Sequence, residues 1–275
     1  PLADSLKAEI FPREVSVSKS IDFVYSVLAV IKSTGLTGFD TIEISTPSRV
    51  EGIDAIQLFD AGGALIGGRE FADLNDRTAV DGFRIVSVTD NHFALAFPHV
   101  TANHSRVDIR FRSQVLTYST NFGGSMRLST ATEAFQVVTA GNAASLGAGD
   151  DPRNSGTTVL SPEVLSGGRL LDQVSIHPNP FSPNGDGVND HLTVEYNLLS
   201  VTAPSPVSIT VHDLRGRLVG IINQSEEISG RYQDKRWDGR SQSGDLLPPG
   251  LYIIRIEVDG DAENAELASL VSLAY

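Results

Sequence analysis

The chain has 275 residues, with 34 Asp and Glu against 21 Lys and Arg, a formal net charge of −13 and no cysteine. The acidic balance argues against nucleic acid as a partner, because affinity for phosphate backbones comes from Lys and Arg. No segment approaches the roughly 18 consecutive apolar residues that a membrane-spanning helix needs, so we expect no membrane span. Without cysteine there are no disulfides, and stability must come from core burial or from bound metal.

The first half of the chain has the two-residue period of β-strands. In the segment Val107–Arg112, Val107, Ile109 and Phe111 should face a core while the charged residues between them face water. Turns containing Gly, Asp or Asn separate such segments, and many short strands at this spacing predict a β-sandwich of the jelly-roll kind. The expected strands cover residues 15–18, 22–32, 39–46, 54–60, 83–89, 93–97, 107–112, 115–119, 125–129 and 134–139.

One of these strands, residues 22–32, is apolar on both faces. Two interpretations remain open. It is either a central strand whose outer face is covered by a loop or by the second domain, or a strand that places Val24, Leu28 and Val30 at an interface with another molecule. The second interpretation follows because large exposed apolar patches usually mark interaction sites.

The composition changes at residues 141–172, which begin with a Gly-rich, small and polar stretch typical of a linker. Thr157 to Leu160 could add a short strand. From Gln173 onward a second series of seven strand-like segments follows in about one hundred residues, the pattern of an immunoglobulin-like sandwich. We therefore expect an all-β chain with an N-terminal β-sandwich at residues 1–140, a linker at 141–172 and an immunoglobulin-like domain at 173–275.

The most informative motif is the segment His177–Asp190, with the sequence HPNPFSPNGDGVND. It is followed in order by Val211–Val219 (VHDLRGRLV), Arg236–Arg240 (RWDGR) and Pro248–Tyr252 (PPGLY). This succession resembles the immunoglobulin-like domain family named after the flagellar hook-capping protein, and the related C-terminal sorting modules of surface proteins exported by the type IX route. The resemblance covers residues 173–275 and implies an extracellular or bacterial cell-surface location.

The same motifs predict how this domain packs. Phe181 stands between prolines and is expected to fill the core, and Trp237 should pack between the sheets with its indole N–H hydrogen-bonded. Pro249-Gly250 should begin the penultimate strand. These are features of the fold and carry no catalytic chemistry.

Residues 182–190 could form a calcium loop. Asn184, Asp186, the Val188 carbonyl and Asp190 take alternate ligand positions, with Gly187 at the sharp turn. Calcium prefers six to eight oxygen ligands, and only two carboxylates stand here. The alternative is a turn held by Asx hydrogen bonds, in which Asn and Asp side chains accept from nearby backbone N–H groups. Calcium is the one cofactor that the sequence suggests.

No catalytic site emerges from the sequence. The six histidines lack metal-ligand spacing, and no nucleophile elbow or dinucleotide loop is present. Tyr118 and Phe122 flank Thr120-Asn121 and could stack on a sugar, which leaves carbohydrate open as a partner.

Two functions fit these observations. The first is a non-enzymatic extracellular structural protein, a subunit or domain of a bacterial surface layer, filament or matrix that self-associates or binds other surface proteins through β-sandwich contacts. Residues 1–18 would be a candidate donor strand for such assembly. The second is the C-terminal accessory region, for sorting, anchoring or sugar binding, of a larger secreted enzyme or adhesin. The start at Pro1 without Met or a leader suggests a processed product or a piece of a longer chain.

Overall fold

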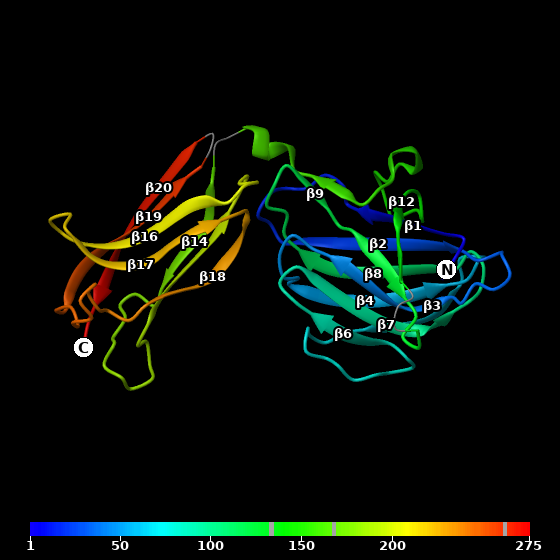
Figure 1. Ribbon diagram of the computed structural model, residues 1–275, viewed down its shortest axis with the longest axis horizontal. Coiled ribbons are helices and arrows are strands. Elements are labelled where there is room, and N and C mark those ends of the chain that lie inside the picture. Colours follow the sequence, from blue (N-terminus) through cyan, green and yellow to red (C-terminus); the bar gives the residue numbers. More distant parts are fainter. Residues whose placement is uncertain (132–134, 167–168, 261–262) are drawn as a thin grey trace. The chain divides into compact units, whose positions relative to one another are not determined.

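The computed structural model describes residues 1–131, 135–166, 169–260 and 263–275 (Figure 1). The described chain is all-β, apart from two short 3-10 helices at Pro152–Asn154 and Pro162–Ser166. It divides into two compact units, Pro1–Pro162 (unit 1) and Glu163–Tyr275 (unit 2). None of the helices found in the described residues is long and apolar enough to cross a membrane. The all-β class and the sandwich architecture are confirmed.

Unit 1 is built from a six-stranded and a five-stranded sheet, with an added two-stranded ribbon. The six-stranded sheet has the order β12 (Thr139–Ala140), β1 (Ser5–Phe11), β2 (Ile21–Val30), β8 (Arg106–Ser113), β4 (Gly52–Phe59) and β5 (Leu65–Glu70). The five-stranded sheet has the order β11 (Phe135–Val137), β10 (Gly124–Arg127), β3 (Phe39–Ser45), β7 (His92–Val100) and β6 (Arg84–Val88). The ribbon pairs β13 (Thr158–Leu160) with β9 (Ser119–Asn121).

The core of unit 1 follows the alternation in the sequence. Val107, Ile109 and Phe111 are buried, as expected for the inward face of β8. The ring of Phe111 lies 5.7 Å from that of Phe23 and 5.9 Å from that of Phe122, centroid to centroid. These aromatic contacts add to the burial of apolar area that drives the two sheets together.

Several strands of unit 1 differ from the sequence-based expectation. Strand β5 is absent from the expected strands, and β1 lies in the segment 1–18 expected only as a donor strand for assembly. Residues 15–18 form no strand, and residues 115–118 precede β9 as irregular chain. Val15 and Val115 are nevertheless buried, so their apolar character reflects core packing without a strand. The strand expected at 134–139 is described only from residue 135, as β11 and the start of β12.

Most of the segment expected as a linker is instead part of the folded unit 1. Strand β13 pairs with β9, and the amide of Ala143 donates to the buried Glu9 carboxylate at 2.7 Å. The amide of Ile10 donates to the carbonyl of Gly156 at 2.9 Å. Residues up to Pro162 therefore belong to the first compact unit, and the boundary expected at residue 140 moves to 162. The reason is that other parts of unit 1 form hydrogen bonds with backbone groups of this segment. A composition of small residues does not reveal these partners.

Unit 2 contains all seven strands that the sequence predicts. One sheet has the order β14 (Leu171–His177), β15 (Leu192–Leu198) and β18 (Gly230–Trp237). The other has the order β17 (Leu218–Glu227), β16 (Ser205–Asp213), β19 (Gly250–Asp259) and β20 (Asn264–Leu273). Three strands against four is the arrangement of an immunoglobulin-like sandwich.

The core of unit 2 confirms the predicted roles of its motifs. Phe181 is fully buried, and its ring centroid lies 5.2 Å from that of Trp237. The indole N–H of Trp237 donates to the carbonyl of Arg240 at 2.9 Å. Strand β19 begins at Gly250, and Tyr252 and the alternate residues after it point into the core.

Candidate functional site

The loop at residues 182–190 is held by the hydrogen bonds of Asx turns. The Asp190 carboxylate accepts from the amides of Gly185 and Gly187, each at 2.8 Å. Asp186 accepts from the amide of Val188 at 2.7 Å, and Asn184 accepts from the amide of Asp186 at 3.0 Å. The two amides donating to Asp190 hold the pKa of its carboxyl below the usual range. The predicted turn is confirmed, and calcium binding stays a prediction.

Strand β2 lies inside the six-stranded sheet, between β1 and β8. Phe23, Tyr25, Val27 and Ala29 face the core on one side. On the other side the expected interface residues Val24, Leu28 and Val30 are half-buried. The two-sided apolar pattern therefore belongs to a central strand, and a role of these three residues in an intermolecular interface remains a prediction.

The N-terminal segment expected as a donor strand lies within this sheet. Strand β1 pairs antiparallel with β2 on one side and parallel with β12 on the other. Leu2 and Ala3 before it are buried as well. In this structure residues 5–11 are thus a strand of their own unit, because the alternation of Leu6, Ala8 and Ile10 completes its core.

A row of polar residues crosses the outer face of the same sheet, which the sequence did not single out. Glu9 stands opposite Ser26 in the register, and Ser26 stands opposite Asp108. All three are buried, and the Ser26 hydroxyl donates to the Asp108 carboxylate. The Nε of Arg106 lies 3.1 Å from an oxygen of Asp108.

Burial sets the electrostatics of this row. Desolvation raises the pKa of Asp108, against the opposing effects of the Ser26 hydrogen bond and the Arg106 charge. Glu9 accepts from the backbone amide of Ala143 at 2.7 Å and also from that of Ala144. Glu9 therefore fastens the segment after β12 to the sheet. The sequence signal was a carboxylate within an otherwise alternating apolar stretch, but the segment that covers it is more than 130 residues away.

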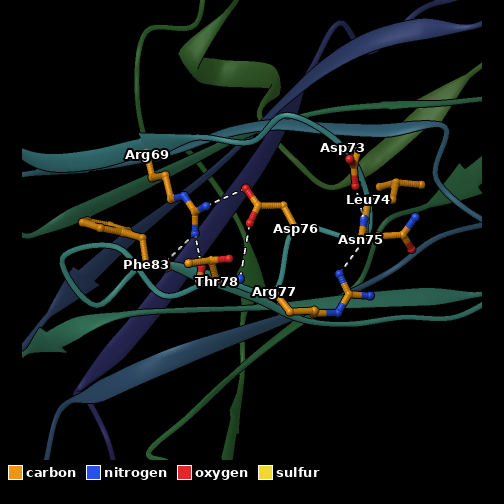
Figure 2. A network of polar contacts seen from close by, with 8 residues as sticks. All are labelled: Arg69, Asp73, Leu74, Asn75, Asp76, Arg77, Thr78 and Phe83. Carbon is orange, nitrogen blue, oxygen red and sulfur yellow. Dashed lines mark hydrogen bonds and ion pairs between the residues drawn. The ribbon is translucent and has the colours of Figure 1, made fainter.

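A second polar network holds the long loop between β5 and β6 (Figure 2). The Arg69 guanidinium contacts the Asp76 carboxylate at 2.5 Å and donates to the carbonyls of Thr78 and, at 3.1 Å, Phe83. The side chains of Arg69 and Asp76 are 11% and 19% exposed. Since β5 and β6 end different sheets of unit 1, this network fixes the connection across one side of the sandwich.

Exposed apolar side chains gather on two strands that end the sheets of unit 1. On β5, Leu65 is 57% and Ile66 is 60% exposed; on β11, Phe135 is 60% and Val137 is 62% exposed. Strand β5 is the last strand of the six-stranded sheet, and β11 is the last of the five-stranded sheet. Such strands are the usual places for strand addition by another chain.

The predicted sugar platform does not form as expected. Tyr118 is 41% exposed, but Phe122 is fully buried among the core aromatics. The two rings cannot present one exposed stacking surface, because Phe122 completes the core beside Phe23.

Comparison with protein families gives unit 2 its assignment. Residues 175–271 match the model of the CHU_C Type IX secretion signal domain. Unit 2 is a type IX secretion signal domain. The protein is therefore a secreted protein with a C-terminal sorting region, exported to the cell surface or beyond it. This confirms the resemblance of residues 173–275 and the extracellular or cell-surface location.

Solved structures similar to the whole chain share little sequence with it. Dimeric latent PorU from Porphyromonas gingivalis is 10% identical with a TM-score of 0.32, over 98% of this chain and 34% of PorU. The group B streptococcus pilus 2b backbone protein is 9% identical with a TM-score of 0.32, over 97% of this chain and 89% of that protein. PorZ, a surface component of the type IX secretion system of P. gingivalis, is 16% identical with a TM-score of 0.27, over 92% of this chain and 37% of PorZ. The chain thus spans about a third of the length of PorU and PorZ, and no curated protein matches it.

Proposed function

We propose that the protein is a non-enzymatic structural component of the bacterial surface, delivered there by unit 2 and assembled through sheet contacts of unit 1. The observation that carries the proposal is the exposure of Leu65 and Ile66 on β5, the last strand of the six-stranded sheet. An edge strand offers unpaired backbone donors and acceptors, and apolar side chains beside it add area that another strand can bury.

The backbone around this edge favours addition of another strand. Arg69 and Asp76 fix the following loop, so β5 is held in an extended form before any partner arrives. A preordered edge loses less conformational entropy on pairing than a flexible segment would. The net charge of −13 keeps single molecules apart at low salt, so assembly should strengthen when salt screens the repulsion.

The test is the assembly state of the full chain, measured by sedimentation velocity and electron microscopy at increasing protein and salt concentrations. We expect ordered assemblies of the wild type, and their loss in Ile66→Lys, which places a charge on the edge. Val188→Lys is the matched control, because Val188 is 63% exposed but lies in the 182–190 loop of unit 2. A wild-type chain that remains monomeric throughout would overturn the proposal and favour the accessory-region alternative.

A further inference from the structure

The two sheets of unit 2 place polar residues on the core-facing sides of strands β17 and β18. In the strand register Asn223 stands opposite Ile209, and Lys235 stands opposite Val194. Both Ile209 and Val194 are fully buried. Because directly opposed residues share a face of the sheet, Asn223 and Lys235 point toward the interior from two different sheets.

Glu227, at the end of β17, joins these two side chains. One of its carboxylate oxygens, Oε1, lies 2.9 Å from the Lys235 Nζ and 3.2 Å from the Asn223 Nδ2. The hydroxyl of Ser225 donates to the same oxygen at 2.7 Å. The amine of Lys235 and the carboxamide of Asn223 thus both contact the same carboxylate oxygen of Glu227.

This cluster is shielded from water. The side chain of Glu227 is 4% exposed and that of Lys235 is 15% exposed. The second oxygen of Glu227 accepts from the hydroxyl of buried Tyr196 at 2.5 Å. Tyr232 stacks on Tyr196, and its ring centroid lies 5.3 Å from the Lys235 Nζ. A buried ion pair is by itself poor evidence of stabilisation, because desolvation offsets the attraction between the charges.

We propose that this cluster is an autocatalytic cross-linking site, in which Lys235 and Asn223 become joined by an isopeptide bond with Glu227 as the catalytic acid and base. Glu227 takes a proton from the Lys235 ammonium across the 2.9 Å contact, leaving a neutral amine. The amine nitrogen attacks the Asn223 Cγ and forms a new C–N bond. The Cγ–Nδ2 bond then breaks, and Nδ2 leaves as ammonium after receiving the two protons that Glu227 carries in turn from Nζ, which returns Glu227 to its carboxylate form.

The step balances without any other reactant. One amide is exchanged for another, nothing is oxidised or reduced, and the only product released is ammonium. The hydrogen bond from Asn223 Nδ2 to Glu227 Oε1 places the proton carrier beside the leaving group. The buried row of unit 1 offers a contrast, since Glu9, Ser26, Asp108 and Arg106 include neither an amine nor a carboxamide and cannot react in this way.

The bond would have a structural consequence that matches its place in the fold. Strand β17 ends the four-stranded sheet and β18 ends the three-stranded sheet of unit 2. A link from residue 223 to residue 235 would therefore tie the two sheets together covalently at one edge. The chain has no cysteine, so no disulfide can supply such a tie.

The test is mass spectrometry of the intact, purified full chain, followed by peptide sequencing of a proteolytic digest. We expect the wild-type mass to be lower than the sequence mass by one ammonia, and a branched peptide that joins residues 223 and 235. Glu227→Gln and Lys235→Arg should each restore the unmodified mass. Lys7→Arg, on an exposed lysine of β1, is the matched control and should keep the loss of ammonia.

The wild-type measurement decides the matter even if a variant fails to fold. A wild-type mass equal to the sequence mass overturns the proposal. So does a loss of ammonia without the branched peptide, which would mark a cyclic imide at an asparagine. The proposed assembly through unit 1 does not depend on either result.

Discussion

Asp108 is a carboxylate that strand periodicity assigns to the solvent-facing side of β8, yet its side chain is only 11% exposed. The residue does face away from the core, as the alternation predicts. Burial comes instead from other parts of unit 1 over that face, where Glu9 fastens the chain at Ala143. Strand periodicity identifies the face on which a side chain lies, but not whether that face is covered.

This burial should make the stability of unit 1 depend on pH. Because desolvation raises the folded-state pKa of Asp108 above its ordinary value, the folded chain binds this proton more tightly than the unfolded chain. The free energy of unfolding should then fall as the pH rises from the unfolded-state pKa through the folded-state pKa. Asp108→Asn should flatten this fall, by about 1.4 kcal/mol for each pKa unit of difference.

The measurement is urea unfolding of the wild type and of Asp108→Asn over a series of pH values. Asp22→Asn, at an exposed position on β2, is the control and should retain the wild-type dependence. An Asp108→Asn variant whose pH dependence equals that of the wild type would show that the Arg106 and Ser26 contacts offset the cost of burial completely.

At the scale of elements, unit 2 could be predicted strand by strand, because its motifs include strong turn signals and its strands alternate clearly. Unit 1 could be predicted only in part. Strand β5 contains Gly67 and Gly68, which weaken its strand propensity. A Cβ at Gly67 would lie 3.2 Å from the Phe83 ring, and one at Gly68 would lie 2.8 Å from the carbonyl oxygen of Ile56. Close tertiary contacts leave little room for a side chain at Gly67 or Gly68. The local sequence does not show these contacts.

The candidate sites divide in the same way. The Asx turn of residues 184–190 could be predicted, because its side-chain acceptor oxygens and the backbone amides that donate to them are neighbours in sequence. The Glu9 and Glu227 clusters could not, because each depends on partners from other strands. Charged residues are mostly exposed in proteins, so a single Glu in a sequence is expected to face water.

The Glu9 contact gives a prediction about the segment that follows β12. In Glu9→Leu the amides of Ala143 and Ala144 lose their acceptor, and each buried unsatisfied amide costs about 1–3 kcal/mol. We expect faster hydrogen exchange at these two amides and a lower free energy of unfolding of unit 1. Lys7→Leu, on the same face of β1 but exposed, should leave both nearly unchanged; equal exchange in all three proteins would contradict the assignment.

At the scale of the whole molecule, the chain combines two compact units with separate hydrophobic cores. Each core is closed by its own strands, so each unit should fold as a fragment. We expect fragments 1–162 and 163–275 to show one cooperative thermal transition each in calorimetry. A fragment ending at residue 140 lacks β13 and the partners of Glu9, so it should melt at a lower temperature than fragment 1–162. Equal melting temperatures would support a boundary of the first unit at residue 140.

The last strand of unit 2 also sets the order of events during synthesis. Asn179, beside the buried Phe181, accepts from the amide of Ser272 at a separation of 93 residues. Ribosomes add about 5–20 residues per second, so the separation of 93 residues corresponds to about 5–20 seconds of translation. Throughout that interval Phe181 lacks its partner strand β20. The signal domain thus cannot close before nearly all of it has been made, whereas unit 1 has its complete set of strands much earlier.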